Sequence, residues 1–249
     1  MDHFAAYRKL FSSTGNDDVC WWYCGMVFTD IDGLGEVPMS QAETLMAFKT
    51  ETPSADRMKI TWREIGYFRD IATGEIVTSW HSPFTGKDEV RAKSFEDGPA
   101  EYTVTRKGDS VEVALRQSHA RIDSVTLVAA VANGQISLVQ TEDKKRSYER
   151  PDGSWPEVDS AEASEIRTVL AIYGSAAEVA DSATTNVRAS GFYRSGSLKK
   201  GGPGAWGNSV VKGVMRKAAA DEPLNPIAWQ RLKQLYPRFF KGDRVSPEW

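Results

Sequence analysis

The chain has 249 residues, a formal net charge of −3 and a sequence pI near 5.7. This slightly acidic balance argues against a general affinity for nucleic-acid phosphates, which requires clustered Lys and Arg. No segment approaches the roughly 20 consecutive apolar residues of a membrane-spanning helix. The composition, 41% hydrophobic and 26% charged, is ordinary for a globular domain. We therefore expect a single domain, 1–249, with no nucleic acid and no membrane among its partners.

The first fifteen residues, MDHFAAYRKLFSSTG, predict a short amphipathic helix closed by Gly15. They lack the apolar core of a secretory signal, so a cytoplasmic protein is expected. The chain has two cysteines, Cys20 and Cys24. In a strand this spacing puts both thiols on one face about 13 Å apart, which is too far for a disulfide. We expect reduced thiols in the core.

Residues 19–141 are predicted to form a meander of short strands separated by turn signals. Gly108-Asp109 and Asn133-Gly134 each mark a two-residue hairpin turn. A long meander closes into an up-and-down barrel or a strongly curled sheet. We predict a mainly β fold, a single antiparallel β-barrel-like domain (lipocalin-like) with short terminal helices. The predicted strands are 19–28, 42–50, 56–68, 75–81, 100–107, 110–117, 121–132 and 135–142.

The rest of the chain is predicted to close this barrel. Residues 143–160 are polar and rich in Pro and Gly, which is typical of a surface loop. Within 161–249, SEIRTVLAIYG fits a strand or a helix, and TTNVRASGFYRSG alternates like a strand. The Gly-rich segment 195–209 is a loop of the kind that can act as a lid. NPIAWQRLKQLYPRFF begins with an Asn-Pro cap signal and predicts a C-terminal helix.

Strand alternation places a carboxylate inside the predicted barrel. In 56–68, Glu64 shares a face with Met58, Ile60 and Trp62. An inward carboxylate must be paired, hydrogen-bonded or protonated, because an isolated buried charge is too costly. Glu64 is therefore either a structural residue salt-bridged to an inward Arg, or a general acid or base with a raised pKa.

The three histidines, His3, His81 and His119, are scattered, and no paired-Cys, H-x-x-x-H or G-x-G-x-x-G motif is present. We therefore expect no metal and no cofactor. His81 follows Trp80 at a strand end, where both a rim position near a ligand and plain turn chemistry fit. His119 ends the predicted strand 110–119, where it fits a hydrogen-bonded structural role or a place at a cavity mouth.

The segment from Tyr67 to Gly86 carries a distinctive pattern of residues. Its spacing resembles the Y-x-x-D-x-x-T-G-E-x-x-x-x-W-x-N-P-x-T-G signature of a bacterial domain-of-unknown-function family, family eighteen-thirty-eight. The segments CWWYCGMVF and YPRFFKGDRV are similar to further parts of that family. Ser82 stands where the family has Asn. The residues that carry the resemblance are Tyr67, Asp70, Thr73, Gly74, Glu75, Trp80, Pro83, Thr85 and Gly86.

Some relatives in this family are associated with the breakdown of lignin-derived aromatic dimers. The resemblance thus implies a cofactor-independent lyase akin to phenylcoumaran gamma-formaldehyde lyases, which opens the ring and releases formaldehyde to leave a stilbene. Such a reaction needs a base near the primary hydroxyl, an acid for the ring oxygen and an aromatic slot. The alternative is a non-catalytic barrel that binds or carries a small aromatic ligand. A homodimer is compatible with both.

For catalysis we single out His81, Glu64 and Tyr67, which are expected around one mouth of the cavity. Tyr67 and Glu64 start on opposite strand faces, so only a bulge at Gly66 or the closeness of the turn could bring both to one rim. The candidate substrate-binding residues are Trp22, Trp62, Trp80, His119, Arg188, Tyr193 and Trp206.

Overall fold

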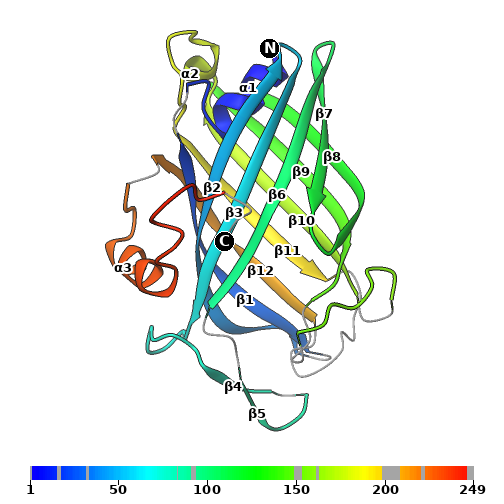
Figure 1. The fold of residues 1–249 in the computed structure, drawn as a ribbon, viewed down its shortest axis with the longest axis vertical. Helices are drawn as coiled ribbons and strands as arrows, with labels where there is room; N and C mark the ends of the chain where they lie inside the picture. Colours follow the sequence, from blue (N-terminus) through cyan, green and yellow to red (C-terminus); the bar gives the residue numbers. More distant parts are fainter. Residues whose placement is uncertain are drawn as a thin grey trace.

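The computed structural model of the protein describes residues 2–15, 18–31, 34–82, 84–90, 94–148, 153–160, 163–197, 208–219 and 222–245. Ten antiparallel strands form one sheet that curls into a nearly closed barrel (Figure 1), which confirms the predicted fold class. The strands are β1 (Val19–Ile31), β2 (Gly35–Ser54), β3 (Arg57–Arg69), β6 (Ser94–Lys107), β7 (Ser110–Gln117), β8 (Ala120–Ala132), β9 (Gln135–Arg146), β10 (Ser164–Ser175), β11 (Ala189–Ser197) and β12 (Asn208–Ala219).

The remaining elements lie at the ends and on the outside of this barrel. The hairpin of β4 (Ser79–His81) and β5 (Asp88–Val90) projects beyond the lower end in Figure 1. Three short helices complete the fold: α1 (His3–Phe11), α2 (Ala176–Ala180) and α3 (Pro226–Leu235).

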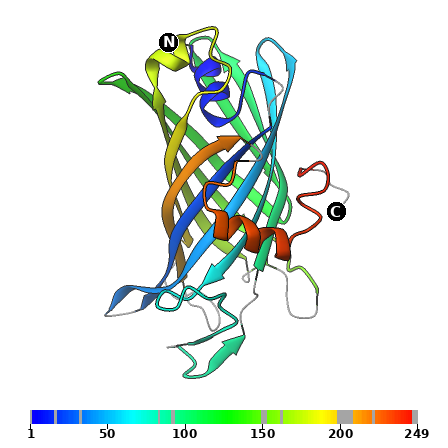
Figure 2. The ribbon, with the colours of Figure 1, turned by 90° about the vertical axis from the view of Figure 1, so that its left-hand side faces the viewer.

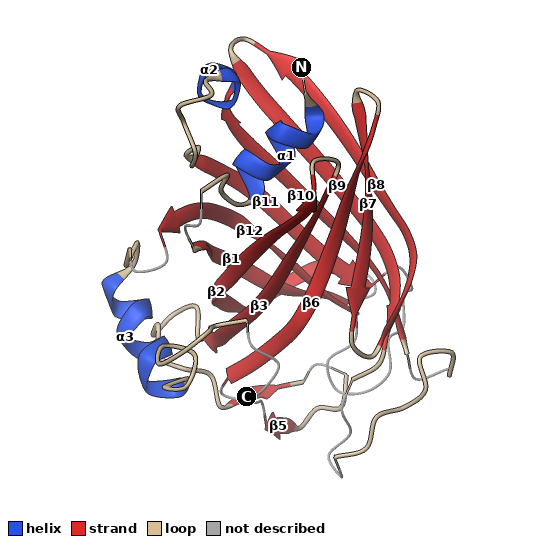
Figure 3. Ribbon diagram, turned by 45° about the horizontal axis from the view of Figure 1, so that its top comes forward, coloured by secondary structure: helices blue, strands red, loops and turns tan. Residues whose placement is uncertain are grey.

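Strands that follow one another in sequence are mostly neighbours in the sheet, whose order is β7-β6-β3-β2-β1-β12-β11-β10-β9-β8. The β4–β5 hairpin is an excursion between β3 and β6, which pair directly. The first and last strands also pair, in a ladder from Val19↔Ala219 to Asp30↔Asn208. The two edge strands, β7 and β8, lie side by side and are joined by a turn at Ser118–His119 (Figures 1 and 3).

The two predicted hairpin turns are confirmed. Asn133 and Gly134 connect β8 to β9 with φ of 52° and 75°, the left-handed conformation that an Asn-Gly pair adopts at low cost. Gly108, with φ of 61°, begins the turn between β6 and β7. The segment 164–175, which fitted a strand or a helix, is a strand.

Three sequence expectations need correction. Only residues 79–81 of the predicted strand 75–81 lie in a strand; Ile76 forms a single bridge with Arg69. The loop expected to begin at residue 143 begins later, because β9 continues to Arg146. Strand β12 was not singled out, although it pairs along its length with β1.

Helix α1 closes one end of the barrel (Figure 3). Asp2 caps it by accepting two backbone N–H groups of the first turn. Tyr7, Leu10 and Phe11 are buried in the barrel core. The indole N–H of Trp21 donates to the carbonyl of Phe11 at 2.9 Å. The helix is therefore an integral part of the core and not a surface appendage.

Helix α3 packs against the outer face of the sheet (Figure 2). Asn225 caps its first turn, and Trp229 packs against Trp22 with ring centroids 5.8 Å apart. Cys20 is buried in this outer cluster, but Cys24, two positions along the same face, is exposed because the cluster does not extend over it. Cys20 and Cys24 form no disulfide in the structure, and the predicted core position holds for Cys20 alone.

We predict that Leu10→Ala lowers the free energy of unfolding by about 2–5 kcal/mol, because it leaves a cavity in the barrel core. The same substitution at Leu34, which is 74% exposed, should change it by less than about 0.5 kcal/mol. Denaturant unfolding of both variants measures the difference. Equal effects would mean that α1 does not contribute to the core.

Candidate functional site

The barrel encloses a cavity of about 80 Å³ below α1. Its lining combines aromatic, aliphatic and charged side chains, so the cavity offers both stacking surfaces and proton-transfer groups. The lining residues are Phe11, Met46, Phe48, Trp62, Glu64, Asp97, Tyr102, Glu142, Lys144, Arg146, Tyr148, Ile166, Thr168, Leu170, Tyr193, Ser195 and Met215.

Glu64 points into this cavity from β3, as strand alternation predicted. Its cross-strand partner in β6 is Asp97, so two carboxylates face the same interior. Burial raises the pKa of Glu64 to about 7, and the charge of Asp97 adds to the rise. A contact from Thr44 and the charge of Arg146 act in the opposite direction. Glu64 can therefore exchange a proton near neutral pH.

Asp97 is held in place by charged and polar partners. Arg146 forms a bidentate ion pair with it, with N–O distances of 2.7 and 2.9 Å. Gln117 donates to both carboxylate oxygens, at 3.0 and 3.2 Å. Both oxygens of Asp97 are thus engaged by donors from Arg146 and Gln117, and Glu64, whose pKa is raised, is the candidate proton-transfer group of this carboxylate pair.

The inward side chains of β9 continue this polar network toward α1. Lys144 donates to Gln117 at 3.0 Å and lies 3.5 Å from Glu142. Glu142 accepts from Tyr102 and from Gln140, both at 2.7 Å. Gln140 accepts in turn from the phenol of Tyr7 in α1, at 2.8 Å. The charged side chains at the inward positions of β9 are thus paired or hydrogen-bonded, as the cost of burying a charge demands.

Aromatic rings also line the cavity. Trp62 and Tyr102 stack with ring centroids 6.3 Å apart and an interplanar angle of 27°. Tyr193 meets Tyr23 edge to face, at 5.4 Å. Trp62 and Tyr193, two of the predicted substrate contacts, thus line the same cavity as Glu64.

Tyr67 and Trp22 do not belong to this cavity, and their predicted place beside Glu64 is corrected. Both are buried on the outer face of the sheet, in the cluster beneath α3. No bulge at Gly66 reverses the parity of β3, since the register between Ile65, Gly66 and Tyr67 and their β6 partners is regular. The cover provided by α3 explains why these aromatic residues face outward.

The outer Tyr67 belongs to a buried polar cluster. Its phenol donates to Glu43 at 2.9 Å, and Arg69 pairs with the other oxygen of the same carboxylate at 2.7 Å. Glu43 is 2% exposed. Burial and the Glu43 contact raise the pKa of Tyr67. The arrangement ties adjacent strands β2 and β3 together under α3.

The distinctive turn after β3 also has a structural role. The Asp70 carboxylate accepts the backbone N–H groups of Ala72 and Thr73, and Gly74 adopts a φ of +72°. Arg231 of α3 donates to the carbonyl of Gly74 at 2.8 Å. This turn therefore supports α3 from the barrel wall.

Ser82 caps the next turn. Its hydroxyl accepts the backbone N–H groups of Phe84 and Thr85, both at 3.3 Å. A serine can thus perform here the capping that an asparagine side chain could perform. Pro83 lies outside the described residues.

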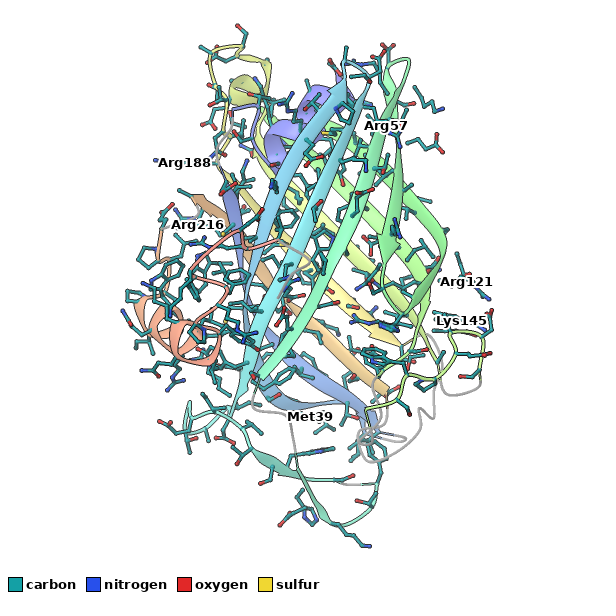
Figure 4. All side chains as sticks on the ribbon, viewed as in Figure 1. Met39, Arg57, Arg121, Lys145, Arg188 and Arg216 are labelled. Carbon is teal, nitrogen blue, oxygen red and sulfur yellow. The ribbon has the colours of Figure 1, made fainter. Side chains whose placement is uncertain are left out.

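His81 and Trp80 lie on the projecting hairpin, apart from Glu64. The His81 ring is 68% exposed and pairs with Asp88 at 2.9 Å. Both residues border a separate groove of about 520 Å³ at the lower end of the barrel in Figure 4, together with Met39 and Val77. Figure 4 marks Met39 at this lower end and Arg57, the first residue of β3, at the opposite end. The rim position of His81 is thus observed, whereas its predicted proximity to Glu64 is not.

The other candidate residues are dispersed. His119 occupies the exposed turn after β7, with φ of 55°, and stacks on Trp155 with centroids 3.7 Å apart. It does not extend β7, which ends at Gln117. Arg188 is exposed outside the barrel (Figure 4). Trp206 and most of the predicted lid, 195–209, lie outside the described residues.

Sequence reasoning missed Asp97, Glu142, Lys144 and Arg146. The available signal was the alternation of QISLVQTEDKKR, in which every second residue from Ile136 onward faces inward. Its polar half was interpreted as the start of a loop, because polar residues in isolation favour solvent. Their partners come from β6 and β7, about 25 to 50 positions earlier in the chain.

Two features are absent from the described part of the chain. Within it, no three His, Cys, Asp or Glu side chains are grouped so that they could hold a metal ion. No described helix has the length and apolar character to cross a membrane. In comparisons with known proteins, no family model and no curated protein matches the sequence.

The raised pKa of Glu64 predicts a pH-dependent stability. Because the folded protein binds this proton more tightly than a carboxyl at the ordinary value of 4.5, the associated stability is fully present below about pH 4.5 and is lost as pH rises through 7. Glu64→Gln mimics the protonated form. It should therefore stabilise the protein at pH 8 by on the order of 2–3 kcal/mol and have little effect at pH 4.5.

Denaturant unfolding at the two pH values measures this difference. Glu101→Gln is the matched control, because Glu101 lies on neighbouring β6 in a partly exposed pair with Lys59. That variant should change stability by less than about 1 kcal/mol at either pH. A Glu64→Gln effect of the same size at both pH values would contradict the assignment.

Proposed function

We propose that the protein is a cofactor-independent lyase that acts on a small aromatic dimer in the barrel cavity, with Glu64 as the proton-transfer group. One observation carries the proposal: a carboxyl group with a pKa near 7 faces a cavity lined by Trp62, Tyr102 and Tyr193. Proton-transfer groups are effective when their pKa lies near the working pH. The resemblance to family eighteen-thirty-eight supplies the reaction type.

The proposed reaction moves one proton and changes no oxidation state overall. The Glu64 carboxylate takes the proton of the primary hydroxyl group of a phenylcoumaran-type substrate. The carbon–carbon bond to the hydroxymethyl carbon then breaks and formaldehyde leaves. The electron pair of that bond forms the stilbene double bond and expels the ring oxygen as a phenolate. The proton on Glu64 finally passes to the phenolate.

The cavity walls favour flat, electron-rich rings. Trp62 and Tyr102 present stacked faces, and offset stacking with a substrate ring contributes beyond the burial of its area. Burial and the charge of Asp97 keep the pKa of Glu64 high, while the charge of Arg146, which is paired with Asp97, lowers it. In this proposal the charged groups of β9 position Glu64 electrostatically and do not touch the reacting atoms.

Formaldehyde release from a small panel of phenylcoumaran-type dimers tests the reaction. The wild type should release formaldehyde and stilbene in equal amounts. Glu64→Gln should lower turnover by about a hundredfold or more, because the proton acceptor is lost. For the wild type, kcat/KM should rise with pH through about 7, since the base must be deprotonated.

Two variants serve as controls for this experiment. His81→Ala and Tyr67→Phe should each keep turnover within about threefold of the wild type, because neither side chain lines the cavity. Tyr67→Phe should nevertheless lower stability by about 1–3 kcal/mol, since it deprives buried Glu43 of a donor. Saturable binding of the dimers with no aldehyde release would instead favour the carrier alternative.

A further inference from the structure

The described lining of the cavity holds more carboxyl groups than cations. Its carboxyl groups are those of Glu64, Asp97 and Glu142, and its cations are those of Lys144 and Arg146. These side chains come from β3, β6 and β9. Because a buried charge without a partner is costly, the charge that a ligand brings decides whether it fits this interior.

Both cations are already paired within the protein. The two terminal nitrogens of Arg146 bind the carboxylate of Asp97 at 2.7 and 2.9 Å. Lys144 donates to Gln117 at 3.0 Å and lies 3.5 Å from Glu142. The side chains of Lys144 and Glu142 are only 8% and 3% exposed. The positive charge of each cation is thus balanced by a carboxylate of the chain itself.

Glu64 differs from the other two carboxyl groups of the lining. Asp97 and Glu142 each have an ion-pair partner, whereas Glu64 forms no ion pair with a described residue. Burial and the charge of Asp97 raise its pKa. The polar groups that interact with Glu64 are Thr44 of β2, Asp97 of β6, Lys144 and Arg146 of β9, Tyr23 of β1 and Tyr193 of β11. A ligand that donates a hydrogen bond therefore finds its acceptor at Glu64.

An aromatic carboxylate would meet the opposite situation. It would bring a further negative charge into a cavity in which both cations already balance a carboxylate. Two donors of the lining, the Nε–H of Arg146 and the indole N–H of Trp62, have no hydrogen-bond partner. A neutral ether or hydroxyl oxygen satisfies such a donor without adding charge, so these donors do not require an anion.

The aromatic part of the lining also suits a positive charge. Phe11 packs edge to face against Phe48 and against Tyr102, with ring centroids 5.8 Å apart in each pair. Tyr102 in turn stacks on Trp62. All four rings line the cavity. The face of an aromatic ring attracts an ammonium group, so these walls favour a cationic ligand over an anionic one.

We infer that the cavity selects aromatic compounds that carry a hydroxyl or ammonium group, which donates to Glu64, and that it excludes aromatic carboxylates. This inference rests on the proposed function in its choice of site. In the proposed reaction the donating group is the primary hydroxyl of the substrate. A dimer whose hydroxymethyl group has been oxidised to a carboxylate is therefore not a substrate, although its rings are the same.

The test measures the affinity of the wild type for benzyl alcohol, benzylamine and benzoate by calorimetric titration at pH 6 and pH 8. At pH 8 benzoate should bind at least about tenfold more weakly than benzyl alcohol. The affinity for benzylamine should rise about tenfold from pH 6 to pH 8, because Glu64, with a pKa of about 7, loses its proton. The affinity for benzyl alcohol should change by less than about threefold, since a hydroxyl can donate to either form of the carboxyl group.

Glu64→Gln keeps an acceptor oxygen but cannot ionise. It should abolish the rise in benzylamine affinity and lower that affinity at pH 8 about tenfold or more, because a charged acceptor is lost. Its affinity for benzyl alcohol should stay within about threefold of the wild type, which also shows that the variant is folded. Glu101→Gln is the control, since Glu101 pairs with Lys59 and does not line the cavity. It should leave all three affinities unchanged.

Three results would overturn the inference. Benzoate that binds as tightly as benzyl alcohol at pH 8 would mean that a cation of the lining is available to ligands. A benzylamine affinity that is the same at both pH values would mean that Glu64 does not receive the donor. Failure of all three probes to bind would mean that the cavity does not take aromatic compounds.

The outcomes also separate this inference from the proposed reaction. If the probes show the expected preference but no dimer yields formaldehyde, the charge selectivity stands and the lyase reaction fails. If dimers yield formaldehyde but benzoate binds as tightly as benzyl alcohol, the reaction stands and the charge selectivity fails.

Discussion

The side-chain bridges between β9 and the strands β6 and β7 are the interaction on which the barrel depends. β7 and β8 are the edges of the sheet, so no backbone ladder closes it there. Instead, Arg146 of β9 reaches Asp97 of β6, and Lys144 reaches Gln117 of β7. Removing one partner of such a buried pair leaves an uncompensated charge, which is strongly destabilising. The same Asp97 raises the pKa of Glu64, so closure of the barrel and tuning of the candidate site share one set of residues.

The fold was largely predictable from the sequence because local signals and long-range pairing agree. The Asn133-Gly134 turn and the alternating strand 110–117 need little tertiary information. The inward position of Glu64 likewise follows from parity alone. Parity also places Tyr67 on the face opposite Glu64, and the expected position of Tyr67 at the cavity rim does not hold because α3 covers that outer face. The polar end of β9 was interpreted as a loop, because its partners are distant in sequence.

The turn after β3 illustrates how a dense pattern of residues can mislead. A Tyr, an Asp and a Thr-Gly-Glu run resemble a catalytic motif. In the structure Tyr67 binds Glu43, Asp70 caps its own turn, and Gly74 accepts from Arg231 of α3. Each residue thus supports the packing of α3 against the wall. The residues of this turn therefore have structural roles here, while the candidate chemistry lies on the opposite face of the same strand.

No backbone ladder joins the edge strands β7 and β8, so this boundary is the line along which the circumference of the barrel can change. A cavity of about 80 Å³ is small beside the roughly 300–1,000 Å³ of typical ligand pockets. In a barrel whose neighbouring strands are all joined by backbone ladders, widening the barrel breaks many hydrogen bonds at once. Here parting β7 from β8 breaks no backbone ladder, and its cost lies in the buried side-chain bridges from β9 to β6 and β7. The wall can thus yield along one line while the other nine strand pairings stay intact.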